Sequence, residues 1–111
     1  MTQPIDVDAA TFAQEVLEHN GTVVVDFWSP TCPHCLRLGP NFAAAAERCD
    51  HGIKFAKVSL QDARPLFSEH GIRAVPTLIL FHCGKKIAQR EGALSSEQIL
   101  SWIEDTRPRE E

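Results

Sequence analysis

The apolar residues of this chain change spacing abruptly near residue 21. Residues 12–17 carry apolar side chains at helical spacing after Asp8, which can cap a helix that ends near Gly21. The run 23–28 is then continuously apolar except for Asp26, a pattern typical of a strand buried on both faces. We therefore expect residues 23–28 to lie centrally in a sheet.

The rest of the chain alternates predicted helices and strands and ends in a hairpin. A glycine turn joins the last two strands, and Ser95 with Gln98 forms a capping box that opens the final helix. Helices on both faces of this mixed sheet predict an α/β sandwich. The expected elements are a helix over 33–48, a strand over 53–60, a helix over 62–70, strands over 77–82 and 86–90, and a helix from residue 95.

Length and charge limit the function classes. With 111 residues the chain fits one domain, here residues 1–107, followed by a charged tail over 108–111. A net charge of −4 and a pI near 5.7 argue against nucleic acid as a partner. No apolar run approaches membrane-spanning length, and the start lacks a secretory pattern. We expect a cytoplasmic monomer that binds neither membranes nor nucleic acid.

Cys32-Pro33-His34-Cys35 is the main candidate for chemistry. Two cysteines three apart at the start of a helix can pass between dithiol and disulfide. Zinc would need a second Cys or His pair, and Cys49 and Cys83 stand far apart, so we expect no metal. We expect Cys49 to be half-buried and Cys83 to be exposed. His70, near a helix end, is expected to face solvent.

Several separated landmarks resemble the thioredoxin family over nearly the whole chain. The resemblance implies a fold with a five-stranded mixed β-sheet flanked by four α-helices, and the activity of a protein disulfide oxidoreductase. The landmarks, in the family's order and spacing, are Val25-Asp26-Phe27-Trp28, the Cys-x-x-Cys seven residues after Val25, Pro40, Lys57, Gly71-Ile72-Arg73, Val75-Pro76-Thr77, Gly84 and Gly92-Ala93.

Three residues at the motif depart from the family pattern. Pro33-His34 replaces the usual Gly-Pro, Thr31 replaces a tryptophan, and Leu36 replaces a lysine. Pro-His is also the dipeptide of the bacterial periplasmic disulfide oxidants. We therefore expect a redox poise more oxidising than that of usual thioredoxins.

The two cysteines and their neighbours suggest distinct roles. The amides and dipole of a helix start favour the Cys32 thiolate, which makes Cys32 the nucleophile and Cys35 the resolving thiol. His34 is expected to stabilise that thiolate further, although it could be only a solvated side chain. Burial should raise the pKa of Asp26, so that it can act as a base for Cys35 or serve only structurally. The resemblance suggests Lys57 as the partner of Asp26.

Val75-Pro76 resembles the family's cis-proline loop opposite the active-site helix. The Val75 backbone would pair with an extended substrate segment. An apolar rim for substrate binding is expected from Trp28, Thr31, Pro33, Val75, Gly92 and Ala93.

The sequence thus predicts a protein-disulfide reductase whose redox group is the Cys32–Cys35 couple, with no separate cofactor. A flavoprotein that resembles thioredoxin reductase would recharge it, and disulfide-bonded proteins would be its substrates. Two alternatives stay open: a disulfide oxidase or isomerase, and a non-catalytic protein-binding module.

Overall fold

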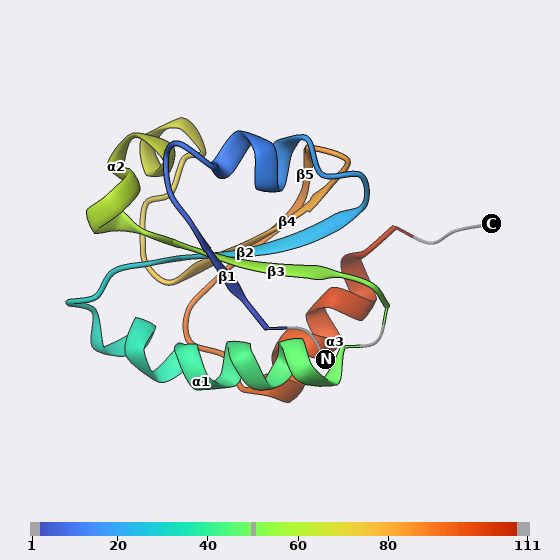
Figure 1. Cartoon of the computed structure of the whole chain (residues 1–111). Coiled ribbons are helices and arrows are strands. Elements are labelled where there is room, and N and C mark those ends of the chain that lie inside the picture. Colours follow the sequence, from blue (N-terminus) through green and yellow to red (C-terminus); the bar gives the residue numbers. More distant parts are fainter. Residues whose placement is uncertain (1–2, 50, 109–111) are drawn as a thin grey trace.

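The computed structural model describes residues 3–49 and 51–108 of the chain (Figure 1), so most of the predicted tail lies outside the described residues. The described part contains five strands and four helices. The strands are β1 (Ile5–Val7), β2 (Thr22–Trp28), β3 (Lys54–Ser59), β4 (Thr77–His82) and β5 (Lys85–Glu91), and the helices are the π-helix η1 (Ala13–Leu17), α1 (Pro33–Arg48), α2 (Leu60–Glu69) and α3 (Ser96–Thr106).

The five strands form one mixed sheet in the order β1-β3-β2-β4-β5. β3 runs parallel to both β1 and β2, whereas β4 runs antiparallel to β2 and β5. Residues 23–27 of β2 are at most 1% exposed. The prediction of a central strand buried on both faces is therefore confirmed.

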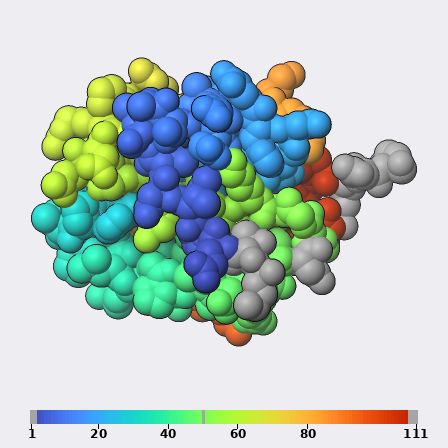
Figure 2. Space-filling view, viewed as in Figure 1, coloured from blue at the N-terminus to red at the C-terminus, as the bar shows by residue number. Residues whose placement is uncertain are grey.

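Helices cover both faces of the sheet, as expected for an α/β sandwich (Figure 1). One apolar core joins α1 and α3 to Val24, Leu78 and Leu80 of the sheet. The other core lies under η1 and α2 and contains Val25 and Phe27. In Figure 2 the edge strand β1 runs across the front of the molecule, between α2 and α1.

His70 is half-buried against the aromatic rings of the second core, so the expectation that it faces solvent is not met. Its ring lies 5.2 Å from the Phe12 ring and 5.7 Å from the Phe81 ring, measured between centroids. Burial lowers the pKa of His70. Both aromatic partners are distant in sequence, so the helix-end position alone gave no sign of this burial.

The N-terminal segment differs most from the expected pattern. Residues 5–7 form the short edge strand β1, which the apolar spacing did not reveal and only the family resemblance implied. Asp8 caps a turn rather than a long helix, because its Oδ1 accepts from the backbone N–H groups of Ala10 and Thr11 at 3.0 Å. The helix itself ends at Leu17, which is 39% exposed.

The turn between β4 and β5 lies against the end of η1. Cys83 and Gly84 both have positive φ values, 50° and 82°, as a two-residue hairpin with a mirror-image turn requires. A Cβ atom on Gly84 would lie 2.4 Å from the carbonyl oxygen of Leu17. Glycine is therefore required here for both its backbone conformation and its small size.

We expect Gly84→Ala to lower the free energy of unfolding by about 3 kcal/mol, since a positive φ and a backbone clash act together. Gly71→Ala is the matched control, because Gly71 has φ 67° but open space around its Cβ position. That control should lose only about 1 kcal/mol. Guanidinium denaturation of both variants tests this, and equal losses would contradict the proposed clash.

Candidate active site

Cys32 lies in the loop between β2 and α1, at the N-cap of the helix. Its Sγ accepts a hydrogen bond from the backbone N–H of Cys35 at 3.2 Å. Pro33 occupies the first turn, where the missing N–H costs no intrahelical hydrogen bond. The Cys32 sulfur thus sits against free amide groups of a helix start, which favour a negative charge.

Cys35 lies one turn deeper and is only 2% exposed. The backbone N–H of Ser29 donates to its Sγ at 3.4 Å. Burial raises the pKa of the Cys35 thiol, and the hydrogen bond with Cys32 contributes to the rise, which brings this pKa to about 12. The pair is therefore asymmetric: Cys32 is accessible at the helix start, and Cys35 is a buried thiol that holds its proton.

Asp26 lies in the buried core of β2, and neither carboxylate oxygen has a hydrogen-bond partner in the described structure. Burial raises the pKa of Asp26 to about 7, although the charge of Lys57 opposes this rise. The value agrees with the expectation that Asp26 can exchange a proton near neutral pH. The charge of Asp26 also raises the pKa of Cys35, so the two groups interact.

Lys57 stands beside Asp26 in the register of β2 and β3. It makes no ion pair with Asp26 in the described part of the chain; its Nζ lies 4.7 Å from the centroid of the Trp28 ring. The two residues therefore interact through charge without an ion pair, and Lys57 also makes a cation–π contact with Trp28.

His34 is exposed on the first turn of α1, where Arg37 Nη2 donates to its Nδ1. An arginine side chain has only donors, so Nδ1 must accept and the ring proton must lie on Nε2. The imidazole in this arrangement is neutral. Arg37 was not among the site residues expected from the sequence. It lies three residues after His34 on the same helix, a spacing that places two side chains side by side and could have indicated the contact.

Val75 and Pro76 face Cys32 across the active site. Their peptide bond is cis, as the sequence pattern led us to expect. The Cys32 thiol points to the carbonyl oxygen of Val75, with 3.7 Å between sulfur and oxygen. Among the described residues, nothing accepts a hydrogen bond from the Val75 N–H.

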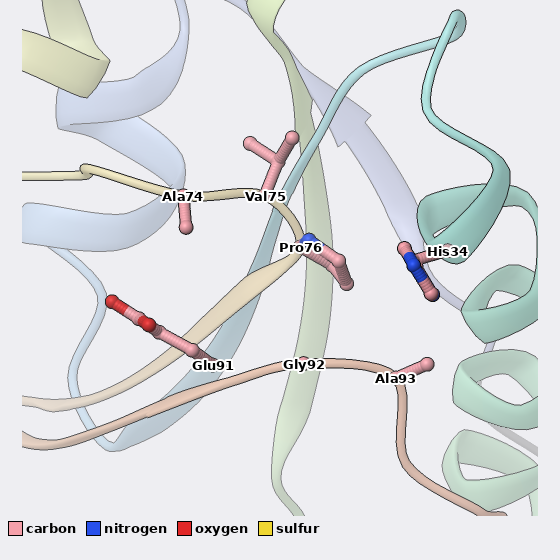
Figure 3. A pocket seen from close by; sticks show the side chains of 7 residues that line it. All are labelled: His34, Ala74, Val75, Pro76, Glu91, Gly92 and Ala93. Carbon is pink, nitrogen blue, oxygen red and sulfur yellow. The ribbon is translucent and has the colours of Figure 1, made fainter.

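A groove of about 550 Å³ runs between the first turn of α1 and the segments around residues 75 and 92 (Figure 3). The expected rim is only partly assembled there. Thr31 lines a separate hollow of about 330 Å³ with Gln61 and Arg64, and neither space is lined by Trp28 or Pro33. The groove is lined by His34, Ala74, Val75, Pro76, Glu91, Gly92 and Ala93.

The other two cysteines lie apart from this pair. Cys49 is half-buried at the end of α1 and Cys83 is exposed in the hairpin turn, as expected. Within residues 3–49 and 51–108, no three His, Cys, Asp or Glu side chains are placed to share a metal ion. None of the helices described is long and apolar enough to cross a membrane.

Comparison with known proteins gives consistent matches over most of the chain. Residues 3–105 match the family described as Thioredoxin. A thioredoxin of Pyropia yezoensis is 36% identical over 97 residues, which cover 87% of this chain and 91% of that protein. Thioredoxin 1 of a Nostoc species is 34% identical over 104 residues, or 94% and 97% of the two chains. A thioredoxin of Pseudomonas aeruginosa is 31% identical over 100 residues, or 90% and 93%.

We expect Asp26→Asn to stabilise the protein more strongly at pH 8 than at pH 5. The folded pKa of Asp26 is about 7, above its ordinary value of 3.8, so the unfolded chain loses this proton at lower pH than the folded one. The stability contribution of the protonated group is therefore present at low pH and is lost as the pH rises through this window. The asparagine side chain does not ionise in this pH range, so the variant does not lose this stability.

The advantage of Asp26→Asn should grow by about 2 to 3 kcal/mol between pH 5 and pH 8, because each pKa unit corresponds to about 1.4 kcal/mol. Urea denaturation at both pH values measures it. Asp105→Asn, an exposed position on α3, serves as the control and should show no such growth. An advantage of Asp26→Asn that is equal at both pH values would show that Asp26 ionises normally in the fold.

Proposed function

Because the chain belongs to the thioredoxin family and has its α/β fold, a five-stranded mixed sheet with four helices, we propose that it reduces protein disulfides by dithiol–disulfide exchange. The observation that carries the proposal is the asymmetry of the two thiols. Cys32 Sγ accepts an amide hydrogen bond at a helix start, and Cys35 is buried directly behind it. A nucleophile needs the first environment and a resolving thiol needs the second.

The reaction takes two steps. The Cys32 thiolate attacks one sulfur of the substrate disulfide, the substrate S–S bond breaks, and the leaving thiolate takes a proton from solvent. Cys35 then attacks the mixed disulfide, giving up its proton, and the second substrate thiol leaves. Two electrons pass to the substrate, which becomes a dithiol, while Cys32 and Cys35 form a disulfide.

Asp26 supplies the proton acceptor for the second step. A thiol with a pKa of about 12 is a poor nucleophile at neutral pH unless a base removes its proton as it attacks. Asp26 has a pKa of about 7 and interacts with the Cys35 charge, so a substantial share of Asp26 is ionised at neutral pH. Lys57 favours the ionised carboxylate of Asp26 through its charge.

Substrate recognition depends mainly on main-chain groups. The Val75 N–H is free to pair with an extended segment whose half-cystine reaches Cys32, and the Val75 C=O becomes free once the Cys32 thiol loses its proton. Pro76, Gly92 and Ala93 give this segment a small apolar surface. Thr31 lines the separate hollow with Gln61 and Arg64, where it would contact more distant parts of a protein substrate.

We assign the redox poise to Pro33 and His34. The neutral imidazole presents an N–H dipole, and the adjacent Arg37 supplies positive charge near the helix start. Both favour the Cys32 thiolate, and a stabilised thiolate makes the disulfide a stronger oxidant. We therefore propose a redox couple more oxidising than that of usual thioredoxins, which needs no separate cofactor. A flavoprotein that resembles thioredoxin reductase would reduce its disulfide again, and the protein would act as a cytoplasmic monomer. The same dipeptide favours disulfide oxidation or isomerisation as the second candidate.

We expect Cys32→Ser to reduce turnover of a disulfide-bonded test protein to below about 0.1% of wild type, because the attacking thiolate is lost. Cys35→Ser should instead accumulate a mixed disulfide, detected by mass spectrometry without reductant. Cys49→Ser and Cys83→Ser are the controls and should retain full turnover. Biological activity retained by Cys32→Ser would favour a non-catalytic binding module.

Replacing Pro33-His34 by Gly-Pro should make the couple more reducing, by tens of millivolts, since a tenfold change in the equilibrium constant corresponds to about 30 mV. Equilibration with glutathione measures the potential. His34→Ala and Arg37→Met, made singly, separate the dipole from the charge, and each should give a smaller shift in the same direction. An unchanged potential in the Gly-Pro variant would show that Pro33-His34 does not set the redox potential.

A further inference from the structure

We propose that Glu91 selects substrate segments that carry lysine or arginine close to the half-cystine attacked by Cys32. This proposal rests on the proposed disulfide exchange and adds the chemical class of its substrates. It follows from the charge and position of one side chain in the groove beside Val75 and Pro76 (Figure 3).

The position of Glu91 is fixed by the sheet. It is the last residue of β5 and stands opposite Thr77, the first residue of β4, directly after Pro76. The backbone N–H of Gly92 donates to the Pro76 carbonyl at 3.0 Å, which holds the end of β5 against the loop. A segment that pairs with the Val75 backbone must therefore pass within reach of the Glu91 side chain.

The Glu91 carboxylate is exposed and makes no ion pair or hydrogen bond within the described residues. It is the single acidic side chain among those that line the groove. Arg90 precedes it, but neighbouring residues of a strand point to opposite faces, and Arg90 does not line the groove. Glu91 is thus an unpaired negative charge that borders the path of the substrate.

The other ionisable group of the groove does not neutralise Glu91. In Figure 3 His34 lies at the far side of Pro76 from Glu91. Its Nδ1 accepts a hydrogen bond from Arg37, so its ring is neutral in this arrangement. The formal charge of the groove lining is therefore that of Glu91, and a cationic substrate side chain is the complement.

The size of the effect follows from the exposure of the pair. Exposed ion pairs are weak, so a lysine in place of a glutamate should raise the rate of reduction about two- to fivefold. Salt screens such pairs, so the preference should shrink as the ionic strength rises. Selection by Glu91 is a moderate bias among substrates rather than an absolute requirement.

The test uses peptides with one internal disulfide that differ at a single residue. Lysine, glutamine or glutamate is placed in turn at each of the three positions on either side of one half-cystine. The measured quantity is the second-order rate constant for reduction by the fully reduced protein at low salt. Wild type should reduce the lysine peptide about two- to fivefold faster than the glutamate peptide for at least one position.

Variants at position 91 separate local selection from net charge. Glu91→Gln should abolish the preference and Glu91→Lys should reverse it, where the preference is the ratio of the lysine-peptide rate to the glutamate-peptide rate within each variant. Glu47→Gln is the matched control, because it makes the same charge change near the opposite end of α1 from Cys32. The control should keep the wild-type preference.

Equal rates for lysine and glutamate peptides in wild type would overturn the proposal, as would a preference that persists in Glu91→Gln or disappears in Glu47→Gln. Failure of the proposed function has a different signature. In that case wild type would reduce none of the peptides, the uncharged glutamine peptide included, and substrate selection would fall with it.

Discussion

The proposed chemistry of this protein depends on the burial of one carboxyl group in the central strand. Asp26 has apolar residues on both sides along β2, and neither of its oxygens has a hydrogen-bond partner among the described residues. The ionised form of its carboxyl group is therefore poorly solvated and unfavourable. The sheet tolerates this because β2 is anchored between β3 and β4 over its whole length. Its pKa of about 7 lies close to neutral pH, as the proposed proton transfer requires.

The remaining parts of the site depend on the same strand. The loop that leaves β2 brings Ser29 to the sulfur of Cys35 and places Cys32 at the start of α1. The neighbouring strand β4 begins at the Val75–Pro76 loop, which closes the other side of the site. The site thus combines a buried carboxyl group, a buried thiol and a more accessible thiol. The proposed proton and electron transfers require these three groups.

Most of the fold could be predicted because its strongest signals are local. The apolar run before Cys32, the helix of residues 33–48 and the capping box at Ser95 each depend on neighbours in sequence. The edge strand β1 has only three residues, too few for its alternation to be distinctive. The aromatic contacts of the half-buried His70 and the place of Glu91 in the groove depend on segments distant in sequence, which no local pattern contains. The two cysteines and their different roles were predicted from their spacing at a helix start, whereas the near-complete burial of Cys35 required the structure.

The rate of the resolving step as a function of pH tests the central claim most directly. The mixed disulfide between Cys32 and a peptide would be prepared at low pH, and release of the peptide thiol would be followed after a jump to higher pH. The rate should rise with a midpoint near pH 7 in wild type, and this rise should be absent in Asp26→Asn. The same rise in both proteins would contradict a role for Asp26 as the base of Cys35.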